Sequence, residues 1–441
     1  MKILCVSLGC DKNLVDTEMM LGLLNRDGHT FTDDENEADI IVVNTCCFIN
    51  DAKEESVNTI LEMAELKKTG KCKALIVTGC MAQRYKQEIL DEIPEVDGIL
   101  GTSTYDEISN VLKQALGGEE HISCFHDLNA LPEVETERVI TTGGYYAFLK
   151  IAEGCDKHCT YCIIPSLRGN YRSVPMERLL KEANQLADQG VRELILVAQE
   201  TTLYGVDLYG KKMLPELLHK LAEIPGIYWI RIQYCYPEEI TDELIEAIRT
   251  EEKVCHYLDV PIQHASDRIL KRMGRRTNQK QLREMIASLR SQIPDIALRT
   301  TLISGFPGET EEDQEEVMRF VDEMEFDRLG VFTYSPEEDT PAATMPDQVA
   351  EEVKEARRDE IMELQQEISY EKSQSMIGKV LEVMIEGKVA DENAYVGRTY
   401  RDAPNVDGLI FVNTSEELMS GDFAKVKVTG SADYDLIGEL L

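Results

Sequence analysis

The sequence has little positive charge for its size. Across 441 residues, 46 Lys and Arg side chains stand against 82 Asp and Glu side chains, so the formal net charge is −36. Contacts from Lys and Arg to phosphates supply most of the affinity of proteins for nucleic acids. The composition therefore argues against nucleic acid as the main partner and favours a basic protein.

The sequence also lacks a long apolar run. No stretch is long enough to span a membrane, and the apolar run at the amino terminus is too short for a signal peptide. We therefore expect a cytoplasmic protein with no membrane partner. In a reducing cytoplasm, the twelve cysteines are expected to be metal ligands or core residues rather than disulfides. The six that fall outside motifs are expected to be small buried hydrophobes: Cys5, Cys47, Cys72, Cys124, Cys235 and Cys255.

Three cysteines share one short segment with the spacing C-x3-C-x2-C: Cys155, Cys159 and Cys162. A four-iron, four-sulfur (4Fe–4S) cluster normally takes four thiolates, so a segment that supplies three leaves one iron open to bind another molecule. The alternative is a zinc site with His158 as the fourth ligand. Zinc sites usually combine a cysteine pair with a second ligand pair farther along the chain, so the spacing favours an iron–sulfur cluster.

This segment, with Tyr161 immediately before its last cysteine, resembles the signature of the radical S-adenosylmethionine (SAM) enzymes. The resemblance implies that the open iron binds SAM, whose cleavage gives a 5′-deoxyadenosyl radical that abstracts hydrogen from an unactivated carbon. It also implies a barrel with its active site at the carboxyl ends of the strands. Tyr161, Gln199 and Gly305 lie in segments that follow such strands, and the resemblance implies that they contact SAM. No residue is assigned a catalytic role.

The first 125 residues alternate Val- and Ile-rich runs with helical patterns, which is typical of a doubly wound parallel sheet. Three of the runs end next to a cysteine: 2–8 before Cys10, 38–45 before Cys46 and 73–78 before Cys80. Open α/β sheets place their ligand sites at the carboxyl ends of strands. These cysteines therefore predict a second cluster site with three thiolates, in which the adjacent Cys47 is an alternative to Cys46.

The segment 7–18, SLGCDKNLVDTE, together with Cys46 and Cys80, resembles the amino-terminal domain of the methylthiotransferases, a family of radical SAM enzymes. The resemblance implies two 4Fe–4S clusters, an auxiliary one on Cys10, Cys46 and Cys80 and the radical SAM one on the C-x3-C-x2-C segment. It further implies that SAM is used twice, once to methylate a sulfur held at the auxiliary cluster and once to generate the radical. We then expect the edge of the first domain to abut the mouth of the barrel. The sequence identifies neither the sulfur donor nor the electron donor.

The remaining chain has two further patterns. Six strand–helix units predict a partial (β/α)6 barrel, with strands at 145–151, 193–198, 228–234, 256–260, 296–304 and 328–334. A long linking helix is expected at 348–375. Short strands after it, at 380–386, 393–398, 409–412 and 423–429, predict a small closed β-barrel that resembles the TRAM domain. The expected domains are 1–125, 141–374 and 375–441.

The last domain bears on the substrate. Residues 376–441 contain twelve acidic and six basic side chains, a balance unsuited to nucleic acid. The strings CIIPS, QHASDR and VGRTY, beginning at residues 162, 263 and 396, resemble the methylthiotransferases that modify the β-carbon of an aspartate in small-subunit ribosomal protein twelve. We expect that basic ribosomal protein to be the substrate. The alternatives are a transfer RNA adenosine methylthiotransferase and, less favoured, a non-catalytic iron–sulfur electron carrier or sensor, which would normally supply a fourth ligand to each cluster.

Two pairs of residues have more than one interpretation. Arg168 and Arg172 follow the cysteine segment, where either a carboxylate of SAM or substrate or a structural ion pair fits them equally. Thr310 and Asp313 lie in a segment at a strand end, but their spacing is also that of a helix cap.

Overall fold

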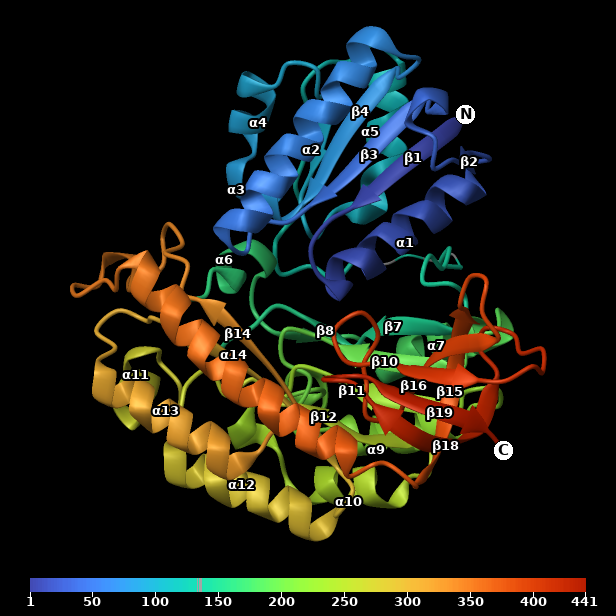
Figure 1. Cartoon of the computed structure of the whole chain (residues 1–441). Helices are drawn as coiled ribbons and strands as arrows, with labels where there is room; N and C mark the ends of the chain where they lie inside the picture. The colour runs from blue at the N-terminus through green and yellow to red at the C-terminus, as the bar shows by residue number, and fades with distance from the viewer. Residues whose placement is uncertain (133, 135–136) are drawn as a thin grey trace.

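The computed structural model describes residues 1–132, 134 and 137–441. Figure 1 shows an amino-terminal α/β unit at the top, a larger unit of parallel strands and outer helices below it, and a small β-barrel on the right. Among the described residues, no helix has both the length and the apolarity that a membrane span requires.

The amino-terminal unit is a parallel sheet with helices on both faces, as predicted. Its strand order is β2-β1-β3-β4-β5-β6. The strands are β1 (Lys2–Ser7), β2 (Thr30–Phe31), β3 (Ile40–Thr45), β4 (Ala74–Gly79), β5 (Gly98–Leu100) and β6 (Ile122–Cys124). The helices are α1 (Asp11–Arg26), α2 (Asn50–Thr69), α3 (Cys80–Tyr85), α4 (Gln87–Glu92) and α5 (Ile108–Leu116). Every residue of β3 and β4 is buried because both faces of the sheet are covered.

The middle unit confirms the predicted partial barrel. Six parallel strands are ordered β14-β13-β12-β11-β10-β7. They are β7 (Tyr146–Lys150), β10 (Glu193–Val197), β11 (Trp229–Ile232), β12 (Val254–Asp259), β13 (Ala297–Ser304) and β14 (Arg328–Thr333). The long outer helices are α7 (Met176–Asp188), α9 (Leu214–Ala222), α10 (Asp242–Thr250), α12 (Gln279–Gln292) and α13 (Glu311–Met324). Thr310 and Asp313 form a capping box at the start of α13, so the cap interpretation of this pair is confirmed.

The linking helix is α14 (Glu351–Gln374), which packs against β14 and α13. It leads to a closed barrel of five strands: β15 (Val380–Lys388), β16 (Ala394–Thr399), β17 (Ile410–Asn413), β18 (Phe423–Ser431) and β19 (Leu436–Leu440). The sequence analysis identified the first four of these strands and missed β19, which alternates buried and exposed residues over only five positions.

The small barrel docks on the amino ends of the parallel strands through buried ion pairs. Glu193 is the first residue of β10, and its carboxylate lies 2.7 Å from Arg398. Arg328 is the first residue of β14 and lies 2.5 Å from Asp402. The opposite, carboxyl ends of the strands are thereby left for the functional site.

Candidate functional site

The C-x3-C-x2-C segment lies in the loop after β7 and the short β8 (Ala152–Glu153). Gly154 opens the loop with φ +79°, and a Cβ there would lie 2.1 Å from the carbonyl oxygen of Asn170. Only glycine allows this close approach. The next residue, Cys155, donates its backbone N–H to the Gly169 carbonyl over 3.1 Å. The loop is thus fixed against the end of α6 (Ile164–Arg168).

Other elements hold the same loop. The Thr160 N–H donates to the Met273 carbonyl over 2.9 Å, and the Ala342 N–H donates to the Thr160 carbonyl over 2.9 Å. The Tyr236 hydroxyl, from the loop after β11, lies 3.5 Å from the Cys159 sulfur. Three separate segments therefore position the cysteines.

The geometry disfavours the zinc alternative. The His158 side chain is exposed. In the part of the chain that the structure describes, no three His, Cys, Asp or Glu side chains are placed to hold one metal ion. A zinc ion needs all its ligand atoms at about 2.0–2.3 Å, whereas each thiolate of a 4Fe–4S cluster binds a different iron. Thiols that share a loop but are spaced more widely suit the cluster.

Burial is the main influence on these thiols. It raises the pKa of Cys155 to about 11 and that of Cys162 to about 12, and the neighbouring thiolates of the same loop add to the rise. Cluster binding requires thiolates. Bound iron would stabilise the thiolate forms of Cys155, Cys159 and Cys162, and an all-thiol donor set of this kind fits an iron–sulfur cluster.

The second set of cysteines lies at the carboxyl ends of β1, β3 and β4. These strands pair in register, with Ser7 beside Asn44 and Asn44 beside Thr78. Cys10 is the N-cap of α1, Cys46 follows β3, and Cys80 begins α3. A Cβ on Gly9 would lie 2.9 Å from the Cys46 sulfur, so the Cys46 side chain lies against the residue that precedes Cys10.

Cys46 and Cys47 have different surroundings. Burial raises the pKa of Cys46 to about 12, and the thiolates of both Cys80 and Cys10 contribute to the rise. Cys47 is fully buried in the apolar core beneath the sheet and interacts with Arg84 and Cys80. Cys46 thus has both Cys10 and Cys80 among its neighbours, whereas Cys47 has Cys80 and Cys46.

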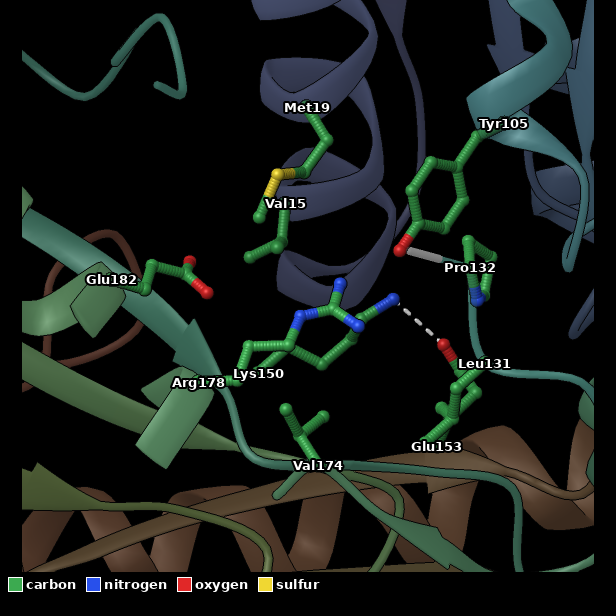
Figure 2. Close-up of a pocket in the computed structure, with 10 residues that line it drawn as sticks. All are labelled: Val15, Met19, Tyr105, Leu131, Pro132, Lys150, Glu153, Val174, Arg178 and Glu182. Atoms are coloured by element: carbon green, nitrogen blue, oxygen red, sulfur yellow. Dashed lines mark hydrogen bonds and ion pairs between the residues drawn. The ribbon is translucent and has the colours of Figure 1, made fainter. Parts of the chain in front are cut away.

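A buried ion network joins the two units. Arg168 is 2% exposed, and its guanidinium lies 2.8 Å from the Asp16 carboxylate of α1 and 3.2 Å from that of Glu153. The Lys150 ammonium lies 2.7 Å from Glu153 and also pairs with Asp16. Figure 2 shows Lys150 and Glu153 in a small cavity beneath α1. Arg168 is therefore a structural ion-pair residue.

Arg172 is also engaged within the protein. It donates to the backbone carbonyls of Arg168 and Asn170 over 3.0 and 2.6 Å. Its guanidinium fastens the chain just after the cysteine loop.

The loop after β11 contacts both cysteine regions. The Tyr234 hydroxyl donates to the Asp11 carboxylate, next to Cys10, over 3.2 Å, while Tyr236 reaches Cys159. The first unit therefore meets the parallel strands at their carboxyl ends, above the barrel in Figure 1. Both sets of cysteines lie at this junction.

The three residues expected to contact SAM have distinct environments. Tyr161 packs edge-on against Phe306, with ring centroids 6.5 Å apart. Gln199 donates to Glu153 and accepts from the Gly154 N–H, each over 2.9 Å, so both ends of its amide are occupied. Gly305 has φ +74°, and a Cβ there would lie 2.1 Å from Cγ of Lys354. Gln199 and Gly305 thus each have a packing or positioning role.

The sequence analysis missed Glu200, which follows Gln199. Its side chain is fully buried, one carboxylate oxygen has no hydrogen-bond partner in the described structure, and the other accepts from the Thr202 N–H over 2.9 Å. Lys157 of the cysteine loop lies 3.9 Å away. Burial raises the pKa of Glu200 to about 7. A buried carboxylate oxygen that accepts no hydrogen bond, beside a cysteine loop, marks a group available to a ligand. Its position at a strand end was visible in the sequence, but the direction of its side chain was not.

Comparisons with known proteins agree along the whole chain. Residues 2–101 match the profile of "Uncharacterized protein family UPF0004", residues 149–321 the radical SAM superfamily, and residues 377–441 the TRAM domain. A protein of Lachnoclostridium phytofermentans named ribosomal protein uS12 methylthiotransferase RimO is 68% identical over 99% of both chains. A protein of the same name from Clostridioides difficile is 51% identical over 100% of this chain and 99% of its own.

Solved structures share the fold at low identity. The radical SAM methyltransferase TsrM from Kitasatospora setae, with cobalamin and a 4Fe–4S cluster bound, matches with a TM-score of 0.56 and 13% identity, over 77% of this chain and 76% of its own. Three observations lead to a single assignment. They are the identity to the named relatives over the full chain, the order of the three family profiles, and the two cysteine sets at one junction. The chain belongs to the RimO family of radical SAM methylthiotransferases.

Proposed function

We propose that this protein transfers a methylthio group to the β-carbon of an aspartate in ribosomal protein uS12. The observation that carries the proposal is the meeting of two three-cysteine sets at one junction, with Tyr234 and Tyr236 of a single loop contacting both regions. The relatives named for uS12 modification cover the full chain. Acting on a ribosomal protein, the enzyme works in the cytoplasm.

The cysteines hold two 4Fe–4S clusters in this proposal. Cys10, Cys46 and Cys80 hold the auxiliary cluster, and Cys155, Cys159 and Cys162 hold the radical SAM cluster. When bound, these clusters and SAM supply the radical that removes a substrate hydrogen and the methylthio group that replaces it. With three thiolates each, both sites leave an iron open.

Residues around the cysteine loop bind SAM and hold the loop in position. Glu200 offers a buried carboxylate oxygen that accepts no hydrogen bond and has only the distant Lys157 ammonium, 3.9 Å away, as a charged partner; such an oxygen suits the amino group of SAM. Tyr161, within the loop, provides an aromatic ring that packs against Phe306. Gln199 holds the Gly154 amide and so fixes the start of the loop, and Gly305 admits Lys354 of α14 at the edge of the site. In this proposal the chain is divided into three domains: 1–125 holds the auxiliary cluster, 141–374 is the radical SAM domain, and 375–441 is the TRAM-like domain.

The charge of the last domain supports a protein substrate. Seven of its acidic side chains are exposed: Glu382, Asp391, Glu392, Glu416, Glu417, Asp433 and Glu439. Both of its arginines, Arg398 and Arg401, pair with carboxylates inside the molecule, which leaves four exposed lysines to face solvent. Such a surface repels phosphates and attracts a basic protein. It favours uS12 over transfer RNA, the second candidate.

Anaerobic turnover tests the proposal. The reconstituted full-length protein is supplied with SAM, a strong reductant and uS12, and the products are followed by mass spectrometry. We expect 5′-deoxyadenosine, and a methylthio group in place of one hydrogen on an aspartate of uS12. Intact clusters that cleave SAM but leave uS12 unmodified would contradict the proposal.

A further inference from the structure

Lys12 is a buried lysine without an ion-pair partner. It lies in the first turn of α1, two residues after Cys10, and is 6% exposed. In the described part of the chain, no carboxylate lies within salt-bridge distance of its ammonium group. The ammonium instead lies over the ring of Tyr234, 3.1 Å from the ring centroid.

The other buried lysines of the described structure are paired. Lys150 lies 2.7 Å from Glu153, Lys157 lies 3.1 Å from Glu238, and Lys354 lies 2.9 Å from Glu351. A buried charge is costly unless it has a partner of opposite sign. A cation–π contact with Tyr234 compensates only part of this cost. Lys12 is therefore the exception among these four lysines, because its ammonium has no carboxylate beside it and remains available to a ligand.

The position of Lys12 matches that of the substrate. Tyr234 follows β11 at the carboxyl end of the barrel and adopts φ +62°, a left-handed conformation that costs a non-glycine residue energy. Its hydroxyl is held by Asp11, and Tyr236 of the same loop lies at Cys159. The ammonium of Lys12 thus lies at the junction between the two cysteine sets, where the carbon that exchanges hydrogen for a methylthio group has to be placed.

We propose that Lys12 binds the side-chain carboxylate of the target aspartate and thereby selects an acidic residue as the substrate. This inference rests on the proposed function. A carboxylate would complete the missing ion pair, and a charge-assisted hydrogen bond from the ammonium would hold the β-carbon in a defined orientation. Tyr234 keeps the ammonium in place before the substrate arrives. An asparagine in place of the aspartate has the same shape but no charge, so the site rejects it.

The test compares two forms of uS12, one with its target aspartate and one with asparagine at that position. Binding to the reconstituted enzyme is measured by calorimetry, and KM and kcat are measured for the aspartate form. The variants are Lys12→Met, Lys12→Arg and, as a matched control, Lys71→Met, which changes an exposed lysine of the first unit.

We expect the unaltered enzyme and Lys71→Met to bind the aspartate form about 10- to 100-fold more tightly than the asparagine form. Lys12→Met should bind both forms equally weakly, with an unchanged iron content and no loss of thermal stability, because it removes a buried charge that had no partner. Lys12→Arg should keep part of the preference. A lysine with only a structural role would instead lower stability and leave the preference intact.

A Lys12→Met enzyme that retains the full preference for aspartate would overturn the inference. If the unaltered enzyme modifies uS12 in that experiment, the proposed function stands while the role of Lys12 fails. If the unaltered enzyme leaves uS12 unmodified, the proposed function itself has failed.

Discussion

Replacing Arg168 by methionine should loosen the junction between the amino-terminal unit and the barrel. Its guanidinium contacts Asp16 of α1 and Glu153 of β8 and also pairs with Asn13, whose side chain donates to the Thr45 carbonyl over 2.9 Å at the end of β3. Without it, two buried carboxylates share the single positive charge of Lys150. Removing one partner from a buried ion pair costs about 3–5 kcal/mol, and methionine retains most of the packing volume.

Denaturant unfolding of the cluster-free protein measures this cost, and hydrogen exchange locates it. We expect faster exchange in α1 and in β8, with little change in the carboxyl-terminal barrel. Arg249→Met is the matched control, because among the described residues Arg249 pairs only with Glu246 on the exposed surface of α10, and such a pair contributes about 0–1 kcal/mol.

A double-mutant cycle isolates the interaction. Asp16→Asn should recover part of the loss when added to Arg168→Met, because Lys150 and Glu153 then remain as a balanced pair. If Arg168→Met destabilised the protein no more than Arg249→Met, or if exchange in α1 were unchanged, the reasoning about the junction would be refuted.

Three further predictions concern single sites. Asp313→Asn should remove about 1–2 kcal/mol of stability at neutral pH, because hydrogen bonds outweigh burial and hold the pKa of Asp313 at about 2. In the unaltered protein this contribution is complete above about pH 4 and is lost as the pH falls toward 2, which thermal melts across that range would detect. Cys46→Ser should abolish one of two clusters in iron and sulfide analysis, whereas Cys47→Ser should retain both, and the reverse result would exchange the two assignments. Gly154→Ala should cost about 1–3 kcal/mol and lower the iron content of the barrel site, because its methyl group meets the Asn170 carbonyl. Full iron content in that variant would show that the loop can shift.

The sequence predicted the parts of the fold in which apolar residues follow a clear pattern along the chain. The six barrel strands lie in apolar runs of four or more residues and α14 has a helical pattern, so their positions could be recognised from apolar residues. The strands β2, β5 and β6 have two or three residues each, which is too short for any period to show. These strands form because they pair with neighbouring strands of the sheet, and such pairing cannot be recognised from a short segment of sequence.

The site was predictable to the same degree. Motif spacing was enough to nominate the cysteines. Spacing could not separate Cys46 from Cys47, because these residues are adjacent in the sequence and differ only in the direction of their side chains. Gln199 and Glu200 pose the same problem, since the sequence does not show that Glu200 has the buried oxygen that accepts no hydrogen bond. The isolation of Lys12 depends on the absence of neighbours from several distant segments, which only a three-dimensional structure reveals.

A competition between substrates tests the central claim most directly. The reconstituted enzyme is given uS12 and an isopentenyl-adenosine transfer RNA in one anaerobic reaction with SAM and reductant, and both are examined by mass spectrometry. The account predicts a methylthio group on an aspartate of uS12 and none on the RNA. A methylthio group on the RNA alone would contradict the assignment of a basic protein as the substrate of this acidic enzyme.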